Sequence, residues 1–238
     1  MPNQNIPYEY EINELAREDS GLMFRIIGEF VEGFDALADV EPAVSIYGSA
    51  RHLEPEDTLY RQTEEIAFRL GKMGLSIITG GGPGTMEAAN KGALRAGARS
   101  IGLNIKLSSE QKPNNFTTQT LNFKYFFVRK VMLVKYASAF IFMPGGLGTL
   151  DELTEVLTLM QTRKIKPFPA ILFDSRYWQG FLEWLRNTSL AQGFINEADL
   201  ALLRVCDQVD EVIEAVHKWQ QKHELGGRRA VIKQENIP

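Results

Sequence analysis

The chain has 238 residues, 44% of them apolar, which is enough to bury the core of one large α/β domain. Its 26 Lys and Arg against 30 Asp and Glu give a net charge of −4, which argues against nucleic acid or an acidic membrane as partner. The single cysteine excludes an internal disulfide, and the N-terminus has no basic and apolar leader. No apolar run reaches the length of a membrane span. We therefore expect a soluble, cytoplasmic protein.

The predicted elements alternate after a helical start. Apolar residues at nearly helical spacing from Ile12 to Leu37 predict an N-terminal helical extension over residues 1–41. Six strands follow, at Ala43 to Tyr47, Leu75 to Thr79, Ser100 to Asn104, Gln119 to Phe123, Ala139 to Met143 and Phe168 to Phe173; the helices fall at Tyr60 to Met73, Thr85 to Ala96, Tyr125 to Tyr136, Leu150 to Thr162, Tyr177 to Leu190 and Val209 to Gln221. This alternation predicts one Rossmann-like α/β domain over residues 42–222, a doubly wound parallel sheet, with a polar tail over residues 223–238.

Three of these strands end in turns suited to an anion. The runs Gly80 to Glu87 and Pro144 to Glu152 each lead from a strand through glycines into a helix, so bare N–H groups and a helix N-terminus lie together. The shorter turn Gly48 to Arg51 adds a hydroxyl and a cation. In an open parallel sheet such turns can line one crevice where the strand order reverses, and a nucleotide-sized ligand is expected there. Each loop alone is equally compatible with an ordinary tight turn.

The commonest nucleotide-binding motifs do not fit. Both glycine loops lack the third glycine of the dinucleotide fingerprint, and the first strand is followed only by Gly48. The acid that binds the ribose of a dinucleotide is missing too, because the second strand ends in Thr79 and glycines. Neither loop runs into Lys-Ser or Lys-Thr, which excludes a Walker loop.

Glu152 stands beside the second predicted anion site. A carboxylate is an unfavourable neighbour for a phosphate, so Glu152 is more plausible as a reactive group than as a phosphate ligand. The alternative is structural: Thr149 and Glu152 have the spacing of a capping box, in which both side chains only satisfy N–H groups at the start of a helix. The sequence alone leaves both interpretations open.

Arg129 and Lys130 are adjacent in the helix that precedes this strand. The first turn of that helix is unusually apolar, because it contains Tyr125, Phe126 and Phe127. A solvated pair of cations is the ordinary interpretation of such a dipeptide, and the aromatic run weakens it. A functional role for the two cations remains the alternative.

These motifs together resemble one known family. Arg129-Lys130 followed by Pro-Gly-Gly-x-Gly-Thr-x-x-Glu is similar to the LONELY GUY family, also labelled lysine decarboxylase-like, over roughly Ala43 to Val216. Gly-Ser-Ala-Arg and Gly-Gly-Gly-Pro-Gly-x-Met-Glu-Ala-Ala-Asn resemble its bacterial branch. The resemblance implies a nucleotide phosphoribohydrolase, which cleaves the N-glycosidic bond of AMP or of an N6-modified AMP such as a cytokinin riboside monophosphate. The products are the free base and ribose 5-phosphate.

The resemblance also implies roles for individual residues. Glu152 stabilises the cationic sugar or activates water, and Arg129 holds the nucleotide and stabilises charge on the leaving base. The expected substrate-binding residues are Gly48, Ser49, Gly82, Gly84, Thr85, Met86, Glu110, Lys130, Gly145, Gly146, Gly148, Thr149 and Thr158. Neither a metal nor a cofactor is expected, since the three histidines lie far apart in the sequence. The loop around Glu110 departs most from the plant-type pattern, which weighs against strict cytokinin specificity.

The sequence also bears on two other functions and on the assembly. A pyridoxal phosphate decarboxylase is rejected, because none of Lys91, Lys106, Lys130 or Lys135 has a recognisable acidic partner for the cofactor ring. A non-catalytic nucleotide or cofactor carrier of the same fold remains the alternative. The helices Tyr125 to Tyr136 and Leu150 to Thr162 are apolar on more than one face, which predicts a homo-oligomer, at least a dimer, unless the N-terminal helix covers them.

Overall fold

The computed structural model describes residues 19–40, 42–51, 53–106 and 112–227. Seven strands form one parallel sheet in the order β4-β3-β2-β1-β5-β6-β7. The strands are β1 (Ala43–Tyr47), β2 (Ser76–Thr79), β3 (Ser100–Ile105), β4 (Gln119–Phe123), β5 (Ala137–Phe142), β6 (Ala170–Phe173) and β7 (Leu203–Cys206). The helices are α2 (Asp19–Ala36), α3 (Thr58–Lys72), α4 (Thr85–Ala96), α5 (Phe126–Lys135), α6 (Leu147–Gln161), α7 (Ser175–Trp184), the π-helix η1 (Leu185–Leu190), α8 (Glu197–Leu200) and α9 (Val209–Gly227).

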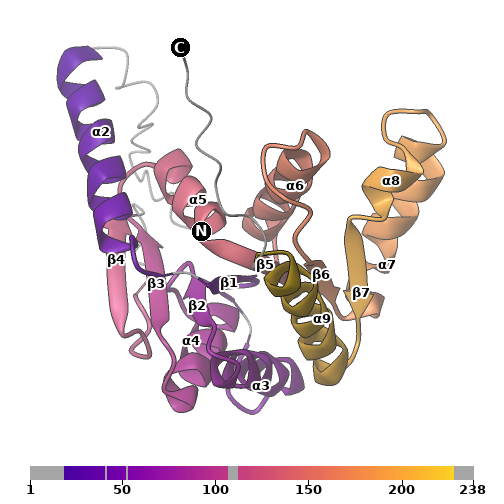
Figure 1. The fold of residues 1–238 in the computed structure, drawn as a ribbon, viewed down its shortest axis with the longest axis horizontal. Coiled ribbons are helices and arrows are strands. Elements are labelled where there is room, and N and C mark those ends of the chain that lie inside the picture. Colours follow the sequence, from indigo (N-terminus) through magenta and orange to yellow (C-terminus); the bar gives the residue numbers. More distant parts are fainter. Residues whose placement is uncertain (1–18, 41, 52, 107–111, 228–238) are drawn as a thin grey trace, which may run out of the picture.

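Side chains of the strands alternate between two hydrophobic cores, one on each face of the sheet. In β1, Val44 and Ile46 belong to the core under α3, α4 and α9, whereas Ala43 and Tyr47 belong to the core under α2, α5, α6 and α7. Figure 1 shows these two groups of helices on opposite sides of the strands. The predicted fold class, a doubly wound parallel α/β sheet, is therefore confirmed. No helix in the described ranges is both long and apolar enough to cross a bilayer.

The main differences from the predicted elements lie near the C-terminus. Strand β7 and the short helix α8 were not predicted, because β7 includes the exposed Arg204 and α8 is only four residues long. The helix expected at Tyr177 to Leu190 is α7 followed by a π-helical turn. Helix α9 continues to Gly227, beyond the expected end at Gln221. The rest of the expected polar tail lies outside the described residues, as do residues 1–18 of the N-terminal extension.

Helix α2 packs on α5 and thereby positions it. Gly33 makes this approach possible, because a Cβ there would lie 2.8 Å from the side chain of Met132. The Glu29 carboxylate accepts hydrogen bonds from the N–H groups of Lys124 (2.8 Å) and Tyr125 (3.2 Å), where the chain enters α5. The N-terminal helix thus covers part of α5. Such cover within the monomer was the alternative to burial of this face in an oligomer.

The order of the strands reverses beside β1. From β1 the chain proceeds outward through β2, β3 and β4, whereas β5, β6 and β7 lie on the other side of β1. The loops that leave β1 and β5 diverge at this point and are joined by one hydrogen bond, from Ser49 N–H to Pro144 O (3.1 Å). Ligands of open α/β sheets bind at such a position, which makes it the expected place for a site.

Candidate active site

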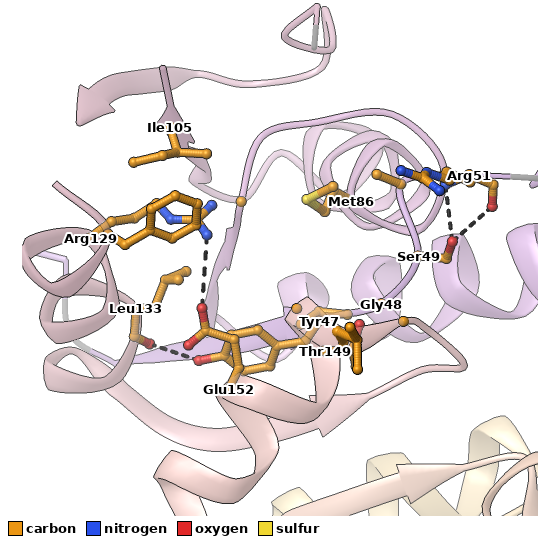
Figure 2. A pocket seen from close by; sticks show the side chains of 17 residues that line it. Tyr47, Gly48, Ser49, Arg51, Met86, Ile105, Arg129, Leu133, Thr149 and Glu152 are labelled. Atoms are coloured by element: carbon orange, nitrogen blue, oxygen red, sulfur yellow. Dashed lines mark hydrogen bonds and ion pairs between the residues drawn. The ribbon is translucent and has the colours of Figure 1, made fainter. Parts of the chain in front are cut away.

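A cavity of about 490 Å³ opens where β1 and β5 diverge. Three loops and helix α5 surround it, as Figure 2 shows. It is lined by Ile46, Tyr47, Gly48, Ser49, Ala50, Arg51, Gly80, Met86, Ile105, Phe126, Arg129, Leu133, Gly146, Leu147, Gly148, Thr149 and Glu152. The turns after β1, β2 and β5 therefore reach one cavity, which is the arrangement that the sequence led us to expect.

The loop from β5 into α6 presents the N-terminus of that helix to the cavity. Helix α6 begins at Leu147, and Gly146 is its N-cap. The N–H groups of Leu147 and Gly148 have no acceptor within the helix, since they belong to its first turn, and both residues are exposed. The N–H of Thr149, by contrast, already donates to Gly146 O (3.0 Å). The positive end of the α6 dipole and at least two free donors thus face the space where an anion would lie.

The carbonyl groups of this loop are held away from the cavity. Pro144 O accepts from Ser49 N–H, and Gly145 O accepts from the hydroxyl of Tyr177 on α7. Gly145 must be glycine, because a Cβ would collide with the Thr149 side chain and would lie 3.0 Å from the carbonyl carbon of Gly48. Gly145 and Thr149 therefore shape the loop, and of these two only Thr149 lines the cavity.

Glu152 lies in the second turn of α6, at the base of the cavity. Its side chain is 7% exposed, and Oε2 has no hydrogen-bond partner. The capping-box interpretation is wrong, because the N-cap is Gly146 and no side chain caps the helix. Burial raises the pKa of Glu152 to about 7, although the positive charges of Arg129 and Lys130 oppose this shift. A buried carboxyl group with a free oxygen and such a pKa is a candidate reactive group.

Arg129 projects from α5 toward Glu152. Its Nη2 lies 3.9 Å from Glu152 Oε1, and its Nε has no partner. The guanidinium lies 5.3 Å from the centre of the Phe126 ring, and a Cβ on Gly80 would approach Nη1 to 3.2 Å. Burial lowers the pKa of Arg129, and the nearby Glu152 opposes this. The guanidinium is thus held in place in the cavity wall (Figure 2), and its buried Nε is an unused donor.

Lys130 faces another way. Its Nζ lies 2.9 Å from the Asp151 carboxylate and 3.4 Å from Glu155 Oε2, both on α6, and it does not line the cavity. Arg129 is buried, so the interpretation as a solvated pair is wrong for this residue. Lys130 links α5 to α6 through its ion pairs. Neighbours in the sequence project about 100° apart around a helix, so only one of them can point into the cavity.

The loop from β2 into α4 contributes less of the cavity wall than its glycines suggested. Only Gly80 and Met86 line it, whereas Gly82, Gly84 and Thr85 do not. Gly84 has a positive φ of 67°, and a Cβ there would lie 2.6 Å from Ser49 O. Thr85 N–H donates to the same oxygen (3.0 Å). Gly84 and Thr85 therefore hold the β1 loop in place, beside Gly48 and Ser49, which do line the cavity.

Thr158 and Glu110 are two further residues that were expected to bind substrate. Thr158 lies on the exposed side of α6, and its hydroxyl donates to Thr154 O (2.7 Å). Glu110 lies outside the described residues. Thr158 was assigned only by loose positional matching to the family, and the helical period carries it away from the cavity.

Several cavity residues were not predicted. Arg51 was noticed as a cation in the β1 turn but was not assigned to the site; it lines the cavity, and the N–H of Arg51 donates to Ser49 Oγ (3.0 Å). Tyr47 is the last residue of β1, and its buried hydroxyl donates to Leu133 O (3.4 Å). Phe126 and Leu147 are 50% and 84% exposed at the mouth. The strand alternation could have identified Tyr47, but no motif marks the two exposed apolar residues.

No group of three or more His, Cys, Asp and Glu residues that could hold a metal ion occurs among residues 19–40, 42–51, 53–106 and 112–227.

Comparisons with known proteins identify relatives of this chain. The sequence model of the family described as "Possible lysine decarboxylase" matches residues 86–216. The chain is 26% identical over 172 residues to "Cytokinin riboside 5′-monophosphate phosphoribohydrolase LOG" of Oryza sativa subsp. japonica, which spans 68% of this chain and 69% of that protein. It is 27% identical over 180 residues to the cytokinin riboside 5′-monophosphate phosphoribohydrolase of Mycobacterium marinum, spanning 72% of this chain and 91% of that protein.

Among solved structures, the fold is similar to that of the molybdenum cofactor binding protein from Rippkaea orientalis, with a TM-score of 0.57 and 20% identity. The match covers 74% of this chain and 96% of that protein, and at this identity it shows the fold alone. The family match covers more than half of the chain and includes α5, α6 and the loop between β5 and α6. The chain therefore belongs to the family described as "Possible lysine decarboxylase", which includes the LONELY GUY (LOG) proteins that it matches.

Proposed function

We propose that the protein hydrolyses the N-glycosidic bond of a purine nucleoside 5′-monophosphate, AMP or an N6-modified AMP, and releases the free base and ribose 5-phosphate. The observation that carries this proposal is the buried pair of Arg129 and Glu152 beside the open N-terminus of α6. The names of the relatives in rice and Mycobacterium marinum support the same reaction.

Glu152 supplies the negative charge that the reaction needs. As the bond between the sugar and the base breaks, positive charge develops on the ribose ring, and a carboxylate in a water-poor site stabilises it strongly. The oxygen of one water molecule bonds to the sugar carbon that carried the base. One proton of that water molecule passes to the departing base through Glu152. The pKa of about 7 suits a group that both accepts and returns a proton near neutral pH.

Arg129 and the first turn of α6 bind the anionic parts of the substrate. The Leu147 and Gly148 N–H groups receive the 5′-phosphate, together with the turn Gly48-Ser49 that faces them across the crevice. Arg129 contacts the nucleotide and stabilises the negative charge that leaves with the base. Arg51 adds a second cation at the opposite side of the cavity from Arg129 (Figure 2).

The apolar wall of the cavity suits a purine base. Met86, Ile105 and Phe126 line it, and Leu147 lies at the mouth. Phe126 and Leu147 are exposed apolar side chains, and covering them with an aromatic base or its apolar N6 substituent is favourable. AMP and N6-modified AMP are both accommodated by this chemistry.

A nucleotide panel tests the proposed function. The protein is incubated with AMP, an N6-prenylated AMP, GMP, CMP and adenosine, and free base is separated by chromatography. We expect base from at least one purine monophosphate and much less from adenosine. Binding of a nucleotide without any release of base would instead favour the carrier of the same fold.

We further propose that the protein is a homo-oligomer, at least a dimer. The residues of α6 that were expected to need cover mostly pack inside the protein, as Leu153 and Val156 do. The exposed apolar side chains on α2 and α5 include Met23, Phe24, Ile27, Val31, Phe34, Phe127 and Val131. A patch of this kind is typical of an interface between subunits.

Light scattering measures the assembly directly. We expect a mass of at least twice 26.8 kDa at micromolar concentration, and a lower mass for the variant Phe24→Asp/Val31→Asp. A mass near 26.8 kDa for the unmodified protein would contradict the oligomer.

A further inference from the structure

Asparagine side chains hold the carbonyl groups of the triple-glycine loop, Gly80 to Gly82. When the Asn104 amide is oriented so that the surrounding hydrogen bonds are satisfied, Nδ2 donates to Gly80 O and Gly81 O, each at 3.2 Å. Asn114 donates twice, from its backbone N–H to Gly81 O (2.9 Å) and from Nδ2 to Gly82 O (2.9 Å). Every carbonyl of the loop therefore has an asparagine donor.

The donors are themselves anchored in the protein interior. Asn114 Nδ2 also donates to Asn90 Oδ1 (2.9 Å), which accepts a second hydrogen bond from Thr79 Oγ1 (2.7 Å). Asn90 Nδ2 donates to Ser100 Oγ (2.9 Å). The three asparagines are at most 9% exposed. A buried polar network with its partners in place is rigid, and it joins the loop to β2, β3 and α4.

The approach of the loop to β3 depends on glycine on both sides. Gly81 has a positive φ of 72°, and a Cβ there would collide with the Asn104 side chain and lie 3.1 Å from the Gly102 Cα. A Cβ on Gly102 would lie 3.1 Å from the Gly81 Cα. The loop is thus seated directly on β3, within reach of the Asn104 amide.

Glycine alone does not determine which way a peptide group points. A Gly-Gly-Gly segment rotates at low cost, so its peptide groups can turn either N–H or C=O toward a bound anion, and C=O would repel it. The β5–α6 loop obeys the same requirement with other donors, because Ser49 and Tyr177 hold its carbonyl groups. Two loops that share no donor thus keep their carbonyl groups bonded and away from the ligand.

We propose that Asn104 and Asn114 are positioning residues, which fix the triple-glycine loop with its carbonyl groups turned away from the bound nucleotide. This inference rests on the proposed function, since it requires an anionic ligand in the cavity. The loop in turn places Gly80 behind Arg129 and Met86 in the cavity wall, so the asparagines act through these groups without touching the substrate.

The test compares Asn104→Leu with Asn122→Leu. Leucine is close to asparagine in size, carries no charge and cannot donate. Asn122 on β4 is the register partner of Asn104; it is exposed, and its side-chain amide lies 3.4 Å from the amide of Asn104. Both variants are made in the Glu152→Gln protein, so that AMP binds without being cleaved, and binding of AMP and adenosine is measured by calorimetry. Thermal unfolding establishes that each variant is folded.

Asn104→Leu should weaken AMP binding about tenfold, because one or two hydrogen bonds that order the loop are lost. The affinity for adenosine should change less than about twofold. Asn122→Leu should leave both affinities unchanged. Unchanged AMP binding in Asn104→Leu, or an equal loss for AMP and adenosine, would overturn the inference while leaving the proposed function intact. If the Glu152→Gln parent binds no purine monophosphate at all, the proposed function fails, and this inference with it.

Discussion

The two glycine loops are similar in sequence but have different roles in the structure. The β5–α6 loop, Pro144 to Thr149, opens the N-terminus of α6 to the cavity and places Glu152 one turn further on. The β2–α4 loop, Gly80 to Thr85, contributes one residue to the cavity wall and has its carbonyl groups bonded to asparagines. Both loops follow a strand and precede a helix, and both are rich in glycine.

The difference shows that glycine content predicts where a loop lies but not whether the loop binds a ligand. In the β2–α4 loop the glycines are required by backbone geometry, as the positive φ angles of Gly81 and Gly84 show. In the β5–α6 loop, a Cβ added to Gly146 or Gly148 would meet nothing within 4 Å, so open space for a ligand explains these two glycines better than packing does. Glu152, the candidate reactive group, lies just after the open β5–α6 loop in the sequence.

The largest effect should come from removing the carboxylate of the open loop. Glu152→Gln should lower kcat roughly 10³-fold or more, because the amide cannot stabilise a cationic sugar, while the protein stays folded and still binds nucleotide. Steady-state kinetics with AMP measures this. The matched control is Glu155→Gln, one turn further along α6, which should retain activity within about threefold. Full activity of Glu152→Gln would remove this residue from the chemistry.

A smaller loss is expected from Arg129→Gln. Its guanidinium is the buried cation of the cavity, so kcat/KM for AMP should fall about 10²-fold. Lys130→Gln tests the neighbouring cation, which pairs with Asp151 and Glu155 outside the cavity, and should cost less than about fivefold. Equal losses of kcat/KM in the two variants would show that the position of Arg129 in the cavity wall gives it no greater role than Lys130.

Alanine substitutions compare the loops directly through stability. Gly81→Ala should lower the free energy of unfolding by about 1–3 kcal/mol, because φ is positive and the new Cβ meets Asn104. Gly146→Ala, with φ at −87° and open space around it, should change it by less than about 0.5 kcal/mol. Chemical denaturation measures both. Similar losses would mean that both loops are constrained by packing.

The pH dependence of stability is expected to show the cost of a buried carboxylate. The pKa of Glu152 is raised above its ordinary value of 4.5 to about 7, so its contribution to stability is present below pH 4.5 and is lost as the pH rises through 7. Glu152→Gln removes this dependence. The stability advantage of the variant over the unmodified protein should therefore grow as the pH rises from 4.5 to 8, to about 3 kcal/mol. A constant difference between the two proteins would mean that Glu152 is not desolvated.

Much of the fold follows from sequence periodicity. The strands β1 to β6 were placed almost correctly, because most of them are apolar runs that lead into a helix. Strand β7 was missed, since its four residues include exposed Arg204 and give no such run. The sheet order and the crevice beside β1 follow from the general topology of α/β folds.

The site was predictable where a motif fixes the backbone and less so where side-chain direction matters. Glu152, Arg129 and the β5–α6 loop were identified, whereas Lys130 and Thr158 were expected in the cavity and lie outside it. Their direction depends on how α5 and α6 are rotated on the sheet. Asn104 and Asn114 carry no motif, and their role emerges only from the distances to the loop carbonyls.

The most direct test of the account is the product balance of a single AMP reaction with the unmodified protein. Adenine, adenosine, ribose 5-phosphate and inorganic phosphate are quantified in the same sample. We expect adenine and ribose 5-phosphate in equal amounts, without adenosine or inorganic phosphate, as cleavage of the N-glycosidic bond requires. Adenosine with inorganic phosphate, or no product from any purine monophosphate that binds, would contradict the proposed hydrolysis.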